Sequence, residues 1–355
     1  MNLLANEKVP FMILPALAFF SLSSLSKFPT NFIGNGQQPQ VSVDTKGIIR
    51  VVFGSDDQIF CATSIDDGVS FNKPLLVGKV PDMHLGMSRG PQFTSSNKIS
   101  VITAMDKMGN IHWYRLNHGT AKWNYMGIVN DLKNSAPEGL MNIAADDKDN
   151  FYAVWLDTRI GKHNQIYFSS LTEKSSKWSK NIMAYQSPDQ HVCECCRPSV
   201  AVKGTSIALM FRNWLNGSRD LYVVRSSDQG KTFSPAVKMG MDTWKLNGCP
   251  MDGGGLRITT ANTVQTVWQR KGNIYYATPG EPEIYLARGR TCSIAGNGTK
   301  PLITYQAGDT LNVITYPQKK PLMIGTGGYL KTAQLSITSN FFVWEQNNQI
   351  KYRRM

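Results

Sequence analysis

The chain has 355 residues, of which 41% are hydrophobic and 18% are charged, with 30 glycines and 17 prolines. This length allows two ordinary domains or one large all-β domain, and the composition excludes a disordered chain. The formal net charge is +13 at pH 7, which favours an anionic partner such as nucleic acid, a membrane surface or an acidic glycan. The basic residues are scattered and form only short pairs, so nucleic acid is not expected.

The N-terminal region carries a hydrophobic segment at residues 11–25, followed by small residues that end at Ser26. A membrane-spanning helix needs about 20 apolar residues, so this segment is too short to be a typical one. Its position predicts a secretory signal peptide over residues 1–26, and an N-terminal membrane anchor is the alternative. Later apolar runs are too short to cross a bilayer. We therefore expect residues 27–355 to form a single exported, monomeric domain, secreted or periplasmic.

The rest of the chain repeats one pattern: an apolar β-type run, a short polar loop and a second run rich in aromatic residues. Seven such pairs occur, at 48–53 with 58–63, 99–104 with 110–115, 151–157 with 165–170, 206–212 with 220–226, 263–269 with 273–278, 301–306 with 310–315, and 341–346 with 349–354. Short runs rich in Val, Ile and aromatic residues between turn residues are typical of strands. A sustained helical period is absent, which excludes an α/β fold.

This repeat predicts the architecture. The units recur roughly every 37–57 residues, and four-stranded antiparallel units with such a period are typical of a β-propeller, in which each pair forms the two middle strands of a blade. The hairpin count predicts seven blades, and the short spacing of the last two units leaves six open. The last unit ends at Met355 with three visible strands. We expect the segment near residues 30–36 to supply its outer strand and close the ring.

Two segments carry a turn motif. Ser64–Phe71 and Ser226–Phe233 resemble the Asp-box, S-x-D-x-G-x-[ST]-[WF], of the sialidase-like BNR-repeat propellers. In such a turn the Asp accepts backbone N–H groups and the Gly supplies a positive φ. Both segments follow the third strand of their unit, so we expect them on one rim of the propeller. The region 138–255 is also similar to an exported subgroup of this family that has CxCC and CPMDGGG segments.

The resemblance implies a six-bladed sialidase with an arginine triad, a Tyr–Glu nucleophile pair and an Asp acid. The Phe/Tyr-Arg-Ile-Pro motif that carries the first arginine of the triad is absent from this sequence. No catalytic residue is therefore transferred from the family by its motif.

Loops between units, and between the second and third strands of a unit, should open on one face of a propeller, where function is expected. These loops contain six candidate substrate-binding arginines: Arg89, Arg159, Arg197, Arg212, Arg219 and Arg270. Several guanidinium groups around one funnel favour bidentate binding of a carboxylate, sulfate or phosphate. We expect Arg159, Arg219 and Arg270 to point inward with free edges. The alternative is that ion pairs with nearby aspartates, such as Asp157, merely hold the loops.

Three carboxylates of the same loops, Glu138, Asp157 and Asp252, are candidates for the acid and base of glycoside hydrolysis. Asp252 lies in the C-P-M-D-G-G-G segment at 249–255, whose glycines allow the backbone to approach the propeller axis closely. Tight packing where the blades converge explains these glycines, and so does a ligand that lies against the backbone.

Four of the six cysteines gather in two loops: Cys193, Cys195, Cys196 and Cys249. Disulfides are one interpretation, because export favours them. A site for a soft metal, Cu(I) or Zn(II), is the second, with His191 and Met251 nearby. A redox-active thiol pair is the third. In each case we expect the loops 187–197 and 244–252 to meet. Cys61 and Cys292 fall in strands and are expected to be buried as small hydrophobic residues.

Together these features predict an exported sialidase-like propeller that hydrolyses or binds an acidic glycan at an arginine-rich funnel. If it is an enzyme, the expected class is a glycoside hydrolase. The alternative is a non-catalytic module that binds metal or glycan through the cysteine loops. The sequence leaves the cofactor open, with Cu or Zn at the cysteines as the candidate.

Overall fold

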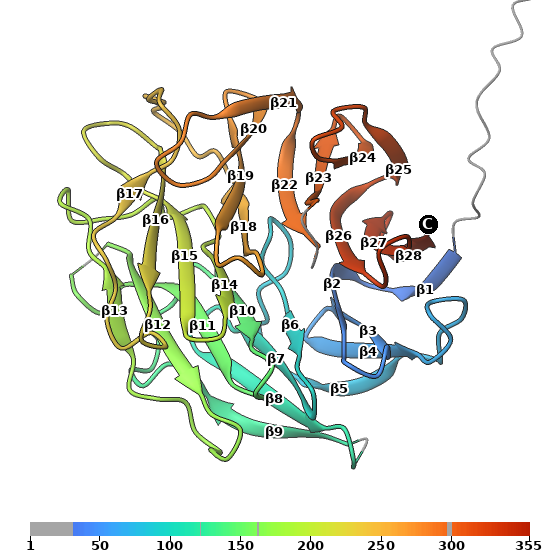
Figure 1. The fold of residues 1–355 in the computed structure, drawn as a ribbon. Coiled ribbons are helices and arrows are strands. Elements are labelled where there is room, and N and C mark those ends of the chain that lie inside the picture. Colours follow the sequence, from blue (N-terminus) through green and yellow to red (C-terminus); the bar gives the residue numbers. More distant parts are fainter. Residues whose placement is uncertain (1–30, 121, 162, 297–299) are drawn as a thin grey trace, which may run out of the picture.

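The computed structural model describes residues 31–120, 122–161, 163–296 and 300–355. In these ranges the chain forms 28 strands and no helix. The strands make seven four-stranded antiparallel sheets, which stand around a central axis like the blades of a propeller (Figure 1). The predicted all-β propeller is confirmed, and the count is seven rather than six. The predicted signal segment at 1–26 lies outside the described residues.

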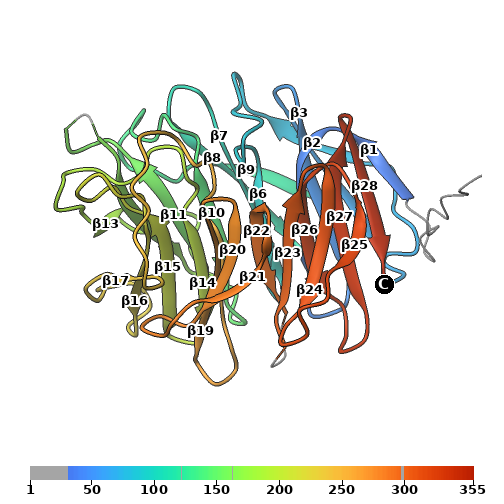
Figure 2. The same cartoon turned by 90° about the horizontal axis from the view of Figure 1, so that it is seen from above.

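The blades follow one another along the chain, and each runs from an inner strand at the axis to an outer strand at the rim (Figures 1 and 2). Blade 1 has β2 (Gln37–Val43), β3 (Ile49–Ser55), β4 (Gln58–Ser64) and β5 (Leu75–Lys79), and blade 2 has β6 (Gln92–Ser95), β7 (Ile99–Met105), β8 (Ile111–Asn117) and β9 (Trp123–Ile128). Blade 3 has β10 (Met141–Ala145), β11 (Phe151–Asp157), β12 (Gln165–Leu171) and β13 (Ile182–Tyr185), and blade 4 has β14 (Ser199–Lys203), β15 (Ser206–Arg212), β16 (Leu221–Ser226) and β17 (Val237–Lys238).

Blade 5 has β18 (Gly255–Ile258), β19 (Val264–Arg270), β20 (Asn273–Ala277) and β21 (Ile284–Arg288), and blade 6 has β22 (Arg290–Ala295), β23 (Leu302–Ala307), β24 (Thr310–Thr315) and β25 (Leu322–Thr326). Blade 7 has β26 (Gly328–Gln334), β27 (Asn340–Gln346), β28 (Gln349–Arg354) and, as its outer strand, β1 (Asn31–Asn35). The seven predicted hairpins are the middle strands of the seven blades, as expected from their periodicity.

The N-terminal strand closes the ring. β1 pairs antiparallel with β28, with Asn31 opposite Tyr352 and Asn35 opposite Gln349. Ile33 of β1 is buried in a cluster that joins blades 7 and 1. The predicted outer strand near residues 30–36 is thus confirmed. Closure of this kind hides the edges that an open array of blades would expose.

The hydrophobic core is divided among the interfaces between neighbouring blades. Trp113 of blade 2 and Trp155 of blade 3 are both buried in one such cluster. Six further clusters occupy the other six interfaces of the ring. Both faces of each middle strand are therefore covered, which explains why these strands read as nearly continuous apolar runs.

The two Asp-box-like segments form the same turn on one rim. In the first, Gly68 N donates to Ser64 Oγ at 2.9 Å and Ser70 N donates to Asp66 Oδ1 at 3.0 Å. The segment Ser226–Phe233 repeats these bonds with the same lengths. Both turns join the third strand of a blade to the fourth. The loops between blades, and those between second and third strands, consequently lie on the opposite face, where the candidate residues are.

Within the described residues, an apolar helix of the length that a bilayer requires is not found.

Candidate functional site

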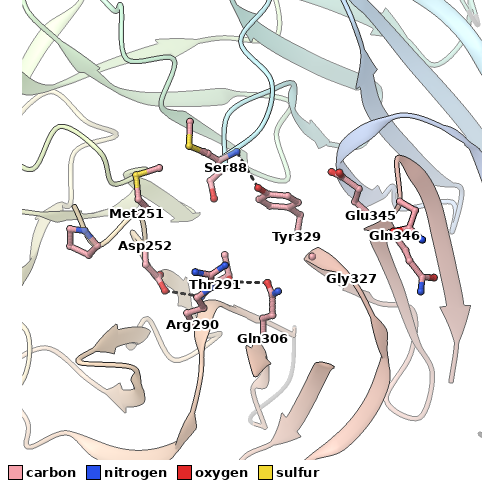
Figure 3. Close-up of a pocket in the computed structure, with 14 residues that line it drawn as sticks. Ser88, Met251, Asp252, Arg290, Thr291, Gln306, Gly327, Tyr329, Glu345 and Gln346 are labelled. Carbon is pink, nitrogen blue, oxygen red and sulfur yellow. Dashed lines mark hydrogen bonds between the residues drawn. The ribbon is translucent and has the colours of Figure 1, made fainter. Parts of the chain in front are cut away.

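The main candidate site is a cavity of about 490 Å³ where blades 5, 6 and 7 meet the loop before β6 (Figure 3). Its lining residues are Met87, Ser88, Pro250, Met251, Asp252, Arg290, Thr291, Gln306, Gly327, Gly328, Tyr329, Glu345, Gln346 and Asn347. Ligand pockets of proteins have volumes of about 300–1,000 Å³, so this cavity is large enough for a small ligand.

Irregular backbone at the start of three inner strands shapes the cavity. The strands β2, β22 and β26 each begin with a β-bulge. Within these bulges Gln38, Thr291 and Tyr329 have φ angles of 56°, 52° and 57°. Such angles are unfavourable for side chains other than Gly, Asn and Asp, and for the β-branched Thr291 above all. The bulges turn the Thr291 and Tyr329 side chains toward the cavity. A regular ladder of backbone hydrogen bonds would instead leave these side chains within the blade.

Asp252 forms one wall. Its Oδ2 accepts a hydrogen bond from Thr291 N at 2.7 Å, and its Oδ1 accepts one from Gly254 N at 3.2 Å. The adjacent Gly253 has no room for a side chain, because an added Cβ would lie 1.8 Å from the carbonyl oxygen of Arg197. The glycines thus allow the close packing of blades that the sequence suggested. The same packing places Asp252 in the cavity wall.

On the other walls lie three residues that sequence reasoning did not select. Tyr329 accepts a hydrogen bond from Met87 N through its hydroxyl oxygen at 3.1 Å. Burial raises the pKa of Glu345, and a hydrogen bond from Gln38 N opposes that shift. Arg290 is exposed, and its guanidinium forms no ion pair or hydrogen bond with the part of the chain that the structure describes. The only signal in the sequence for Arg290 and Tyr329 was a glycine just before each bulge, at 289 and 327, and Glu345 had no such signal.

The guanidinium groups of Arg159 and Arg270 are held in two similar networks. Arg159 contacts Asp157 and Asp131 at 2.9 and 2.6 Å and stacks over a tyrosine ring of its own blade. Arg270 pairs with two acidic residues and lies over the Tyr275 ring. The free guanidinium edges that the sequence predicted are therefore not found here. Asp157 is fully buried and anchors Arg159, as the alternative interpretation expected.

Arg212 is 1% exposed, and its guanidinium forms hydrogen bonds with backbone carbonyl groups. Its guanidinium donates two hydrogen bonds to Asp252 O, at 3.1 and 2.8 Å, and others to the carbonyls of Gln269 and Arg219. Arg212, a candidate substrate-binding arginine, is thus buried and occupied by backbone carbonyls, and its role in binding stays a prediction. Arg197 reaches the axis, where it donates to Gln92 Oε1 at 3.0 Å. Burial lowers the pKa of Arg197 to about 10, and Asp252 opposes that shift.

Arg89 and Glu138 form a separate pair beside the cavity. Their side chains lie 3.6 Å apart, and Arg89 Nε also donates to the Glu138 carbonyl. Burial raises the pKa of Glu138, Arg89 opposes that shift and Glu194 adds to it. Of the three predicted carboxylates, only Asp252 lines the cavity. Catalysis by any of the three stays a prediction.

The cysteine loops meet, as the sequence predicted. The Sγ atoms of Cys193, Cys195 and Cys196 are 3.5–4.0 Å from one another, and Met251 from the facing loop packs against them. All three are buried, whereas Cys249 is exposed, and none of the six cysteines is in a disulfide in the described residues. Arg219, the third arginine expected to point inward with a free edge, donates a hydrogen bond to Cys193 Sγ at 2.9 Å. Cys61 and Cys292 are buried elsewhere, as expected.

His191 lies in a different group from the cysteines. One ring nitrogen of His191, one of His163 and one carboxylate oxygen of Glu194 lie within 4.8 Å of one another. His163 Nδ1 is 3.3 Å from Glu194 Oε1, and His191 stacks on Trp214 at 5.5 Å between ring centroids. Within the described residues, His191 Nδ1 is buried without a hydrogen-bond partner. Two separate groups of side chains therefore offer metal-ligating atoms. One offers the sulfurs of the three buried cysteines, and the other offers the nitrogen and oxygen atoms of the two histidines and Glu194.

Comparison with known proteins gives the fold but no family. No family model and no curated protein matches the sequence. The chain is similar to the BP39L lectin from Burkholderia pseudomallei, with a TM-score of 0.69, 8% identity, and coverage of 92% of this chain and 96% of the lectin.

Two lyase structures give similar matches. One is a PL25 ulvan lyase bound to -[GlcA(1-4)Rha3S]-, with a TM-score of 0.57, 10% identity, and coverage of 92% of this chain and 94% of that one. The other is a virginiamycin B lyase from Staphylococcus aureus, with a TM-score of 0.56, 13% identity, and coverage of 93% and 100%. These identities establish a shared propeller fold, and the resemblance to the sialidase-like family stays an expectation.

Proposed function

We propose that the protein binds an acidic glycan in the central cavity and that Arg290 binds its anionic group. The observation that carries this proposal is the cavity itself, in which a guanidinium without partners faces a set of hydroxyl, amide and carboxylate groups. A guanidinium binds a carboxylate or sulfate through two parallel hydrogen bonds. The polar groups of Thr291, Gln306 and Tyr329 can exchange hydrogen bonds with sugar hydroxyls. A sialic-acid ligand, as the resemblance implies, is the narrower form of this proposal.

Two further observations support the proposal. The net charge of +13 attracts polyanions over the whole surface. Among the similar structures, BP39L is a lectin and the ulvan lyase is bound to an oligosaccharide that contains GlcA.

Binding can be tested by calorimetry with oligosaccharides that contain sialic acid, uronic acid or sulfate. We expect Arg290→Ala to lower affinity at least about tenfold, because charge-assisted hydrogen bonds contribute about 1.5–3 kcal/mol. Arg288→Ala is the matched control, since Arg288 is an exposed arginine on β21 outside the cavity lining. Wild-type protein that binds none of these glycans, or equal losses in both variants, would refute the proposal.

Hydrolysis is a second candidate, favoured by Glu345. Burial raises its pKa, which is the direction that a general acid requires, and Asp252 lines the same cavity as a possible base. We expect Glu345→Gln to abolish hydrolysis of an acidic glycoside whose leaving group is a sugar or alkyl alcohol, which needs a proton to depart, while glycan affinity stays within about threefold. Glu281→Gln, an exposed glutamate in a loop of blade 5, is the control. Turnover that survives in Glu345→Gln excludes this residue as the acid.

A further inference from the structure

The three buried cysteines have the spacing of metal ligands. Their Sγ atoms lie 3.5, 3.6 and 4.0 Å apart. In a tetrahedral zinc site with Zn–S bonds of about 2.3 Å, neighbouring sulfurs are about 3.8 Å apart. A trigonal Cu(I) site with bonds of similar length requires nearly the same spacing. One ion can therefore contact all three thiols of Cys193, Cys195 and Cys196 with little movement of the loop.

One cation already lies beside the cluster. The guanidinium of Arg219 donates a hydrogen bond to Cys193 Sγ at 2.9 Å. A positive charge so close to a thiol favours its thiolate, which is the form of cysteine that binds metals.

The facing loop offers a fourth soft ligand. The thioether side chain of Met251 packs against the cluster, and Cys249 lies two residues before it in the same loop. Three thiolates with a further thiolate or a thioether select soft ions such as Cu(I) and Zn(II). His163, His191 and Glu194 offer nitrogen and oxygen instead, and two of these residues are largely exposed at their side chains.

We propose that Cys193, Cys195 and Cys196 bind one thiophilic metal ion, Cu(I) or Zn(II), with Cys249 or Met251 as the fourth ligand. The ion links the loop between β13 and β14 to the loop between β17 and β18. Met251 also lines the central cavity, so the metal site adjoins the proposed glycan site. The metal proposal does not depend on glycan binding, because it rests only on the cysteine loops.

The test uses the full chain, purified with a reductant that does not bind metals. Cu(I) and Zn(II) are titrated separately against a chromophoric chelator, which gives the stoichiometry and the affinity. We expect one equivalent of ion, bound at least about 100-fold more weakly by Cys193→Ala and by Cys196→Ala. The control is Cys61→Ala, which removes a buried thiol in the hydrophobic cluster between blades 1 and 2 and should bind like the wild type.

Further variants identify the fourth ligand and the ion. If Met251 is the ligand, Met251→Leu weakens Cu(I) and leaves Zn(II) unchanged, because zinc is bound by Cys, His and carboxylate ligands. If Cys249 is the ligand, Cys249→Ala weakens both ions. X-ray absorption at the metal edge should show sulfur neighbours.

Three outcomes overturn the proposal. The first is a reduced chain that binds neither ion at one equivalent. The second is binding that survives in Cys193→Ala and Cys196→Ala but is lost in His163→Ala, which would assign the ion to the nitrogen and oxygen set. The third is a count of free thiols that shows a disulfide among the three cysteines in protein kept under reductant. Circular dichroism of each variant verifies that it has folded.

Discussion

At the scale of single residues, the arginines show that residue type alone does not predict whether a side chain is structural or available for a ligand. Arg159 and Arg270 complete ion-pair networks, and Arg212 satisfies backbone carbonyls. Arg219 donates to a thiol. Arg290, which motif reasoning passed over, has its guanidinium free in the cavity within the described structure. The difference is made by whether a carboxylate or carbonyl lies within reach, and sequence distance does not report that.

Lys331 is the other unusual cation. It lies on β26 and lines a narrow space of about 30 Å³ at the axis, together with Arg197 and Asp252. Burial lowers its pKa well below the usual value, and repulsion from Arg197 adds to the shift. Between this lowered pKa and the unfolded value of about 10.4, the unfolded chain binds a proton that the native amine does not. The free energy of unfolding therefore rises with pH across that window.

We predict that Lys331→Met is more stable than the wild type at pH 7, and that the difference shrinks as the pH approaches 10. At pH 7 the native state must either deprotonate the Lys331 amine or bury its positive charge, and both lower the free energy of unfolding. The methionine side chain has no such cost. Thermal unfolding of both proteins from pH 6 to pH 10 measures the effect. Lys203→Met, which changes an exposed lysine at the end of β14, should follow the wild-type curve. A less stable Lys331→Met at pH 7 would show that the charged amine is paired and stabilising.

At the scale of elements, the inner strands both pack the blades together at the axis and supply residues that line the cavity. Their bulges place Thr291 and Tyr329 in the cavity at backbone angles that cost energy. The segment before β18 is the tightest part, since Gly253 lies against the backbone of Arg197. A position of this kind admits no side chain, because the atom in the way is backbone rather than a movable side chain.

We predict that Gly253→Ala lowers the free energy of unfolding by about 3 kcal/mol or more, because the methyl group forces blades 4 and 5 apart. Denaturant unfolding measures this loss. Gly119→Ala is the control, since an added Cβ there meets no atom within 4 Å, and its effect should stay within about 0.5 kcal/mol. Equal stability of the two variants would mean that the inner strands can shift apart without cost.

At the scale of the whole molecule, ring closure determines which residues meet. β1 completes blade 7 beside β28, so the two ends of the described chain lie in one sheet. The closed ring brings Arg197 of blade 4, Asp252 of blade 5 and Lys331 of blade 7 to the same axis. It also brings the loop before β6 against Tyr329 of blade 7, 242 residues away in sequence. The cavity is a product of this closure and belongs to no single blade.

The sequence by itself determined the local structure. Apolar runs separated by turn residues specified the seven hairpins, because strand formation and turn formation each depend on only a few neighbouring residues. The incomplete last unit pointed to closure by the N-terminal strand. The cysteine spacing indicated a cluster, because Cys193, Cys195 and Cys196 lie within four residues of one another and must stay close in any fold.

Only the tertiary structure decided the partners of the charged side chains. Whether an arginine is free or paired depends in part on groups that other segments bring within reach, such as Asp131 for Arg159 and Asp242 for Arg270. The bulges that aim Thr291 and Tyr329 inward arise where strands converge on the axis, and a glycine before them is a weak signal. For the same reason Asp157 became a buried anchor, while Glu345 and Arg290 became cavity residues.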